Sequence, residues 1–540
     1  MKLNRKAIIE QKENYQKAEI KLPTFDYDKV RKDTINNPTW LHFGAGNIFR
    51  AFPAVLQQKL LEEGIENKGI IVAEGYDYEI IDKLFHPHDN LSLLVTLKAD
   101  GSIEKTVIGS VVEALRVDVS YKEDKQRLIE IFRSPSLQMV SFTITEKGYQ
   151  ISRSNGEVLP DIAKDFEEGP RNAHSYLGKL TALCYERYLA GKLPFSLVSM
   201  DNCSHNGDKL YAAVDTFAKE WKKRNLVEEG FVSYIENPDL VAFPWTMIDK
   251  ITPRPDESVK KMLLEVGFHD VDDVVTSKNT YVAPFVNAEE AEYLVIEDAF
   301  PNGRPDLSKV GVIFTNKETV DKVEKMKVCT CLNPLHTALA VFGCLLGFTK
   351  ISDEMKDNDL VKLVEHLGYV EGLPVVVNPG IMDPKEFLDT VIKIRIPNPF
   401  MPDTPQRIAT DTSQKLAIRF GETIKAYQKQ EGTPIRSLKI IPLVQAAWCR
   451  YLLGIDDEGK VFTVSSDPYF DELKKILHGV ELGKPLPQSF HISEILSRKD
   501  IFGVDLYEVG LGEIVEEYFN RMLEGKGAVR RTLKEVVMEI

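Results

Sequence analysis

The segment from Thr39 to Gly75 constrains the fold more than any other part of the 540-residue chain. It begins with the strand-like run TWLHFG at 39–44, passes through GAGNIFR into an apolar-periodic stretch, and closes with GIIVAEG at 69–75. Gly64 suits the residue that follows the end of a helix. Strand, glycine turn, helix and strand in this order form a β-α-β unit, which predicts a parallel sheet.

The glycine turn has the composition of a dinucleotide-binding loop. Gly44 permits a tight turn, and Gly46 lets the backbone approach a pyrophosphate at the start of the helix. Glu74, near the end of the second strand, is expected to accept hydrogen bonds from the adenosine ribose. That carboxylate favours NAD over NADP, because a 2′-phosphate would meet a negative charge. Phe49 replaces the third glycine of the usual motif, so a glycine turn of any α/β domain stays the alternative.

Further strand-like runs alternate with helical segments in the first half of the chain, at 91–97, 106–115, 137–145 and 195–201. This alternation predicts an α/β fold with a doubly wound sheet. After about residue 285 long helix-like segments dominate. We therefore expect a Rossmann-type, NAD(P)-binding domain over 1–285 and a mainly α-helical domain that carries substrate and catalytic residues over 286–540. Ligands bind beyond the carboxyl ends of such strands, which points to the loops 145–149 and 201–207.

Charge and composition exclude several classes of protein. The formal net charge of -14 disfavours nucleic acid or an anionic membrane as a partner, because both require clustered basic surface. The N-terminus has no apolar leader, and the most apolar run, Ala338–Phe348, is too short to span a bilayer. Six scattered cysteines fit a reducing compartment. We expect a cytoplasmic protein.

The stretch KVCTCLNPLHTALAVFG at 327–343 has two incompatible interpretations. Either Cys329 and Cys331 bind a metal with His336, or the cysteines pack in the core and the polar residues carry the chemistry. The cysteine pair lacks a second pair at zinc-site spacing, which favours packing, and no metal is expected.

Ordered landmarks along nearly the whole chain resemble one family, the mannitol dehydrogenase family of long-chain polyol and uronate dehydrogenases. The landmarks include HFGAGNIFRAF, VSFTITEKGY, VSMDNCSHNG, FPWTMIDKITP, CLNPLHTALA and RIATDTSQKLAIR. The resemblance implies an NAD(P)-dependent oxidoreductase that works without a metal on a small sugar acid or polyol, as a monomer or a homodimer. Its cofactor turn resembles G-x-G-x-F-x-R, and its general acid/base is a lysine in a K-x4-N-x2-H signature.

The resemblance assigns site residues by position. Those expected to bind the cofactor are Gly44, Gly46, Asn47, Ile48, Phe49, Arg50, Glu74, Thr145 and Glu146. Those expected to carry the catalysis are Lys327, Asn333, His336, Asn202 and Asp249. Taken singly, Asn333 also reads as a plain helix cap and His336 as a histidine in the first turn of that helix.

Lys327 departs from the family spacing, because it precedes Asn333 by six positions where the signature has five. Pro334 disfavours helical geometry at Asn333, so we expect Asn333 to cap a helix and 327–332 to be extended, with a bulge absorbing the extra residue. Lys325, Lys250 and Lys415 are the other candidates for the acid/base.

Ketone reduction builds negative charge on oxygen, and the site therefore needs a proton donor and fixed hydrogen-bond donors. A carboxylate on the substrate would separate uronates from polyols, and Arg254, Arg407 and Lys415 are candidates to bind it. The form of the glycine turn and of CLNPLH is closer to the uronate branch. The expected activity is reversible reduction of D-fructuronate to D-mannonate with NADH, in hexuronate catabolism. Tagaturonate reductase and mannitol 2-dehydrogenase are alternatives, as is a non-redox epimerase or ligand-binding protein.

Overall fold

The computed structural model describes residues 1–153, 155–430, 432 and 434–540, and these form two compact units. The first unit comprises residues 1–98 and 102–321, and the second comprises 99–101 and 322–540. A boundary at 285 is expected from the sequence, but the strands β13 (Phe285–Glu289), β14 (Tyr293–Glu297) and β15 (Ile313–Thr315) pair within the first unit. This unit therefore includes these strands and ends at residue 321, in the first turns of the following helix.

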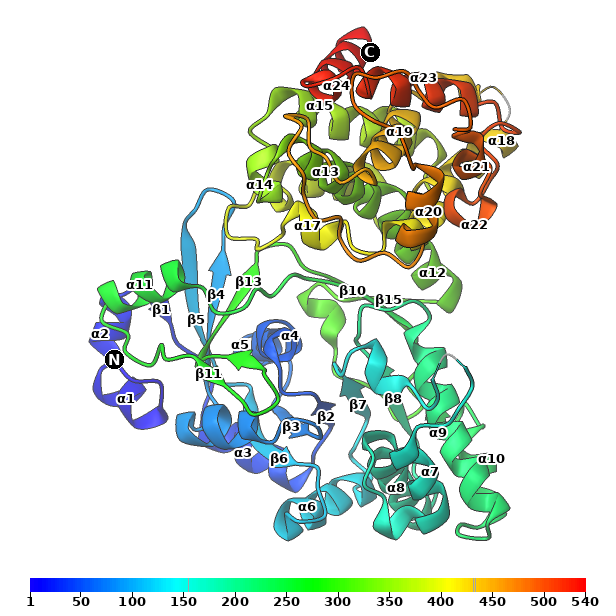
Figure 1. Ribbon diagram of the computed structural model, residues 1–540. Coiled ribbons are helices and arrows are strands. Elements are labelled where there is room, and N and C mark those ends of the chain that lie inside the picture. The colour runs from blue at the N-terminus through cyan, green and yellow to red at the C-terminus, as the bar shows by residue number, and fades with distance from the viewer. Residues whose placement is uncertain (154, 431, 433) are drawn as a thin grey trace. The chain divides into compact units, whose positions relative to one another are not determined.

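A six-stranded parallel sheet forms the centre of the first unit (Figure 1). Its strands, in spatial order, are β6 (Val111–Arg116), β3 (Ile70–Glu74), β2 (Trp40–Phe43), β7 (Met139–Phe142), β8 (Phe195–Ser199) and β9 (Val241–Ala242). From β2 the chain adds strands on one side and then, from β7, on the other. This is the doubly wound Rossmann order, with the switch point between β2 and β7, so the predicted fold class is confirmed.

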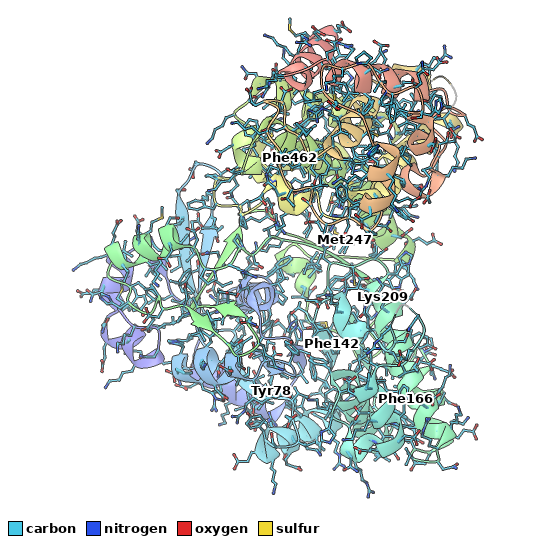
Figure 2. All side chains as sticks on the ribbon, in the orientation of Figure 1. Tyr78, Phe142, Phe166, Lys209, Met247 and Phe462 are labelled. Atoms are coloured by element: carbon cyan, nitrogen blue, oxygen red, sulfur yellow. The ribbon has the colours of Figure 1, made fainter. Side chains whose placement is uncertain are left out.

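The central strands are buried on both faces because successive side chains alternate between two hydrophobic cores. Leu41 and Phe43 of β2 belong to one core, and Trp40 belongs to the other. Phe43 stacks on Phe142 with ring centroids 5.4 Å apart, and Figure 2 labels Phe142 in the interior of this unit. The α-helices that contribute to the two cores are α4 (Asn47–Ala51), α5 (Pro53–Glu62), α6 (Lys122–Arg133), α7 (Pro160–Glu168), α8 (Tyr176–Leu189), α9 (Asn206–Lys223) and α10 (Glu229–Ile235).

Two of the predicted strands differ from the expected arrangement. The run at 91–97 forms β4 (Ser92–Leu97), which belongs to a separate mixed sheet in the order β1-β5-β4-β13. The run at 106–115 is split, because β5 (Ile103–Ile108) ends before Gly109 and β6 begins at Val111 in the parallel sheet. β1 (Ile20–Lys21) completes the mixed sheet, and β10 (Thr246–Asp249) pairs with β14 in a third sheet.

The second unit is mainly helical, as predicted (Figure 1, yellow-green to red). Every residue of α19 (Ile440–Tyr451) is buried, and this helix packs against α13 (Asn333–Leu346) and α23 (Gly512–Met522). Glu371 caps α19 from another part of the chain, because its carboxylate accepts the backbone N–H groups of Lys439, Ile440 and Ile441. Burial raises the pKa of Glu371 to about 7.

A nearly continuous helical segment runs from Lys317 to Leu346. It consists of α12 (Lys317–Met326), the π-helical turn η6 (Lys327–Cys331) and α13, and only Leu332, with φ -129°, departs from helical geometry. The expectation that 327–332 is extended is therefore wrong: the Leu332 N–H donates to the Lys327 carbonyl, five residues earlier. By length and composition this helix would also cross a bilayer, but 78% of its most apolar window is buried inside the protein, which identifies a core helix.

Candidate functional site

The glycine turn follows β2 at the switch point of the sheet. Gly44 has φ +106°, and a Cβ there would lie 2.3 Å from the Thr143 carbonyl oxygen, so the fold itself requires glycine. Gly46 has an ordinary φ of -77°, and a Cβ there would meet nothing within 4 Å. No protein atom therefore requires glycine at position 46, and the open space beside its backbone fits a closely approaching pyrophosphate.

Of the residues that follow the glycine turn, Phe49 and Arg50 lie in the protein interior and Ile48 lines a cavity. Phe49 is buried and stacks on His42, with ring centroids 4.3 Å apart. Arg50 is buried too, and it donates to the Ala283 carbonyl at 2.7 Å and to the Asn47 side chain at 2.8 Å. Burial lowers the pKa of Arg50 to about 10. The guanidinium thus fixes α4 and Asn47, while Ile48 lines a cavity described below.

Glu74 ties the glycine turn to the end of β3. Its carboxylate is 6% exposed and accepts the N–H groups of Ala45 at 2.8 Å, Tyr76 at 2.8 Å and Asp77 at 3.2 Å. Burial raises the pKa of Glu74, and the three N–H donors oppose that rise. Sequence reasoning missed this structural role, and the ribose contact expected of Glu74 stays a prediction.

A cavity of about 520 Å³ lies beyond the ends of β3 and β6. Its lining is rich in carboxylates, which are Asp77, Glu79, Asp82, Asp118 and Asp161. Tyr176 and Lys179 of α8 also line it, and the Lys179 ammonium lies 3.4 Å from the Asp118 carboxylate. Burial lowers the pKa of Lys179.

A second cavity, of about 290 Å³, brings together four of the predicted site residues, Ile48, Thr145, Glu146 and Asn202. Asp249, 6% exposed, ends β10 between Ile248 and Lys250, which both line this cavity. Asp201 also lines it, and sequence reasoning missed this residue although it stands beside Asn202 at the end of β8.

Two lysines of the first unit, Lys209 and Lys250, form ion pairs with carboxylates. The Lys209 ammonium, labelled in Figure 2, lies 2.5 Å from the carboxylate of Glu146. The Lys250 ammonium lies 2.8 Å from that of Glu292 and donates to the Glu289 carbonyl. Lys250 is therefore a poor candidate for the proton donor.

In the second unit, Lys327 opens the π turn and is 3% exposed. Asn333 is the first residue of α13, and His336 follows three residues later on the same face of the helix. Both side chains are half-buried. The π turn contains one residue more than an α-helical turn, which is the number by which Lys327 exceeds the family spacing.

The two cysteines of this turn are free thiols. Cys331 is buried, its Sγ lies 3.7 Å from the Pro384 carbonyl oxygen, and burial raises the pKa of the thiol to about 12. Within the described ranges no group of three His, Cys, Asp or Glu side chains is placed to hold a metal ion. The burial of Cys331 fits packing in the core for that thiol, and the expectation that the protein works without a metal stays a prediction.

Basic residues cluster against α13. Arg419 donates to the Thr337 hydroxyl at 2.6 Å, and burial lowers the pKa of Arg419 to about 10. Lys415 donates to the backbone carbonyls of Ile408 and Thr410, and burial, together with Arg419, lowers its pKa. Arg407 pairs with Asp403 and stays 62% exposed.

Arg254, the third residue predicted to bind a substrate carboxylate, belongs to the first unit. Its side chain is exposed, and the guanidinium lies 4.5 Å from the centroid of the Tyr281 ring.

A doubly wound parallel sheet with an open glycine at its switch point, followed by a helical unit with a buried lysine, defines a Rossmann-type oxidoreductase. Residues 38–309 match the mannitol dehydrogenase Rossmann domain, and residues 319–522 match the mannitol dehydrogenase C-terminal domain. The chain belongs to the mannitol dehydrogenase family. This confirms the predicted family and the predicted class of enzyme, a nicotinamide-dependent dehydrogenase that acts on a CH–OH group.

Individual relatives cover nearly the whole chain. D-mannonate oxidoreductase from Thermotoga maritima is 54% identical over 539 residues, which are 99% of each chain. Mannitol 2-dehydrogenase from Aspergillus fumigatus is 32% identical and covers 91% of this chain and 90% of its own. The solved ternary complex of Pseudomonas fluorescens mannitol 2-dehydrogenase with NAD and D-mannitol is 26% identical over the full length of both chains, with a TM-score of 0.69.

Proposed function

We propose that the protein is an NAD-dependent uronate reductase that interconverts D-fructuronate and D-mannonate. The observation that carries this proposal is the 54% identity to D-mannonate oxidoreductase over 99% of both chains, against 32% to mannitol 2-dehydrogenase. Six free thiols support the cytoplasm as its compartment, where such a reductase serves hexuronate catabolism.

NAD, and not NADP, is the proposed cofactor, and in its reduced form it supplies the hydride. The five carboxylates around the larger cavity support this choice, since they would repel the additional phosphate of NADP. Glu74 supports it further, because its buried carboxylate lies at the end of β3. Gly46 leaves the open space that a pyrophosphate requires.

Lys327 is the proposed general acid for ketone reduction and general base for the reverse reaction. The carbonyl oxygen gains negative charge as the ketone is reduced, and the lysine ammonium donates a proton to it. Asn333 and His336 are the fixed donors that hold this oxygen. The π turn supports the assignment, because it accommodates the extra residue between Lys327 and Asn333 without ending the helix.

Asn202 and Asp249, which both belong to the first unit, are also proposed to assist catalysis. Asn202 lines the smaller cavity, where its amide is suited to share the contact with the substrate oxygen. Asp249, buried at the end of β10, is proposed to orient a base or a substrate hydroxyl.

The substrate carboxylate is proposed to bind Lys415 and Arg407. Lys415 is half-buried and donates to two neutral carbonyls, and the carboxylates of Asp411 and Asp467 offset part of its charge. A substrate carboxylate would offset the rest. Arg419 adds a second buried cation close to α13. Because Arg254 stacks on Tyr281 in the first unit, it is the weakest of the predicted carboxylate ligands.

The proposal is tested by following NADH oxidation with D-fructuronate, D-tagaturonate and D-fructose, for the wild type and Lys327→Ala. We expect turnover on D-fructuronate and loss of most of kcat in the variant. Preference for D-tagaturonate or D-fructose would instead identify a tagaturonate reductase or a mannitol 2-dehydrogenase. Absence of turnover despite NADH binding would favour a non-redox epimerase or a ligand-binding protein.

A further inference from the structure

The loop after β7 contains a backbone conformation that its residue disfavours. Thr145 has φ +66° and ψ 158°, a region that glycine occupies almost exclusively. The described residues with positive φ other than glycine are Glu19, Asp89, Asn90, Thr145, Lys192, His205, Asn225, Asn279 and Asp411, and Thr145 is the β-branched one among them. Such strain persists only where the surrounding structure enforces it.

The carboxylate of Asp201 holds the backbone of Thr145 in this strained conformation. One oxygen accepts the N–H of Thr145 at 2.8 Å, and the other accepts the N–H of Ile144 at 3.0 Å. The second oxygen also accepts the Tyr149 hydroxyl, from the far end of the same loop. Asp201 is 8% exposed, and burial raises its pKa.

Asp201 is itself held in place by its neighbours. Its carbonyl accepts the Asn206 side-chain N–H at 3.0 Å, and the same amide group binds Thr246 of β10. The carboxylate therefore connects the ends of β7 and β8 at a fixed separation. Thr145, Glu146 and Asn202, which lie on these two loops, line the cavity of about 290 Å³.

We infer that Asp201 is a positioning residue, which holds Ile144 and Thr145 in the strained turn and thereby forms the wall of this cavity. The inference rests on the proposed function, in which Asn202 contacts the substrate, and on the cofactor contacts expected of Thr145 and Glu146. Asp201 acts through these residues and needs no contact with a ligand. A carboxylate is required because it only accepts hydrogen bonds, whereas an asparagine amide would turn an N–H group toward one of the backbone N–H donors.

The first test is Asp201→Asn in the full chain, with NADH affinity measured by fluorescence titration. We expect NADH binding about tenfold weaker or worse, because a charge-assisted hydrogen bond to the strained turn is lost. Tyr149→Phe is the matched control: it removes a neutral partner of the same carboxylate, leaves both backbone N–H bonds, and is expected to weaken binding less. Affinity within about twofold of the wild type in Asp201→Asn would overturn the inference.

A double variant tests the strain itself. Glycine adopts φ +66° freely, so Asp201→Asn with Thr145→Gly is expected to bind NADH at least about threefold more tightly than Asp201→Asn alone. No gain from glycine would contradict the strained-turn explanation. These readouts use NADH alone, so they remain valid if D-fructuronate proves not to be the substrate.

A third comparison does not depend on whether Asp201→Asn folds. Thr145→Gly and Thr145→Ala, both with Asp201 intact, remove the same side chain but differ in strain. We expect the glycine variant to melt a few degrees higher than the alanine variant, which reverses the ordinary order for these residues. An alanine variant as stable as the glycine variant, or more so, would show that the turn is not strained.

Discussion

Gly44 and Gly46 lie two residues apart in one turn, but the fold requires glycine only at position 44, and Gly46 is proposed to serve cofactor binding. Alanine at Gly44 would adopt φ +106° and place its Cβ 2.3 Å from the Thr143 carbonyl oxygen. The disfavoured conformation costs about 1–2 kcal/mol, and relieving the overlap costs roughly 1–3 kcal/mol more. We therefore expect Gly44→Ala to lose about 2–5 kcal/mol of stability, which lowers the melting temperature of the first unit by about 3–7 °C.

Alanine at Gly46 has ordinary backbone angles and open space around its Cβ. Its stability is expected to stay within about 1 kcal/mol of the wild type. The methyl group would instead occupy the space proposed for the pyrophosphate. Loss of one charge-assisted hydrogen bond, about 1.5–3 kcal/mol, would weaken NADH binding roughly 10- to 150-fold.

Both variants are measured by thermal denaturation without ligand and by fluorescence titration with NADH. The reasoning predicts a destabilised Gly44→Ala and a stable Gly46→Ala that binds NADH poorly. It would be refuted by a Gly46→Ala protein with wild-type NADH affinity, since the open space would then serve no cofactor. A stable Gly44→Ala would refute the steric argument for that position.

Four further experiments test the roles of Lys415, the π turn, Cys331 and Glu371. Lys415→Met is expected to raise KM for D-fructuronate at least about tenfold and to change D-fructose kinetics little, because only D-fructuronate has a carboxylate that the lysine is proposed to bind. Equal losses on both ketones would exclude that role. Deletion of Val328 shortens the π turn and gives Lys327 the family spacing to Asn333, so kcat should stay within about tenfold of the wild type, whereas Lys327→Ala should lose most of kcat. A completely inactive deletion variant would argue against Lys327 as the lysine of the family signature. Cys331→Ser and treatment with EDTA should both leave kcat unchanged, and a loss with EDTA would restore the metal interpretation. Burial raises the pKa of Glu371 from 4.5 to about 7. Because the folded state binds this proton more tightly than the unfolded state, the protonated side chain contributes about 3 kcal/mol to the free energy of unfolding below pH 4.5. This contribution is lost as the pH rises to 7. The advantage of wild type over Glu371→Gln in melting temperature should therefore shrink between about pH 5 and 8, and a constant advantage would show that Glu371 does not titrate in that range.

The nucleotide-binding half of the fold was predictable because local pattern and tertiary role agree there. The run from Thr39 to Gly75 has apolar strands on both sides of a turn with glycine where φ is positive, and the sheet forms as expected. The prediction of a single strand at 106–115 was wrong because the apolar residues form one unbroken run. In the structure one strand ends before Gly109, and the next strand, which belongs to a different sheet, begins at Val111.

The site was harder to predict because its hydrogen bonds join distant segments. Glu74 holds its own glycine turn, and Asp201 holds a loop more than fifty residues earlier in the chain. No sequence spacing encodes either contact. The π turn escaped prediction for another reason. Pro334 marks the start of α13, as expected, but the chain before it is a π-helical turn instead of an extended segment, and Leu332 between the two has φ -129°.

Hydride transfer to the ketone carbon of a uronate can be followed by isotope labelling. The enzyme is incubated with D-fructuronate and NADH deuterated at the transferable position, and the product is examined by NMR. We expect D-mannonate with one deuterium at the carbon that carried the ketone. A product without deuterium, or one labelled at another carbon, would show that the protein does not transfer a hydride to this ketone.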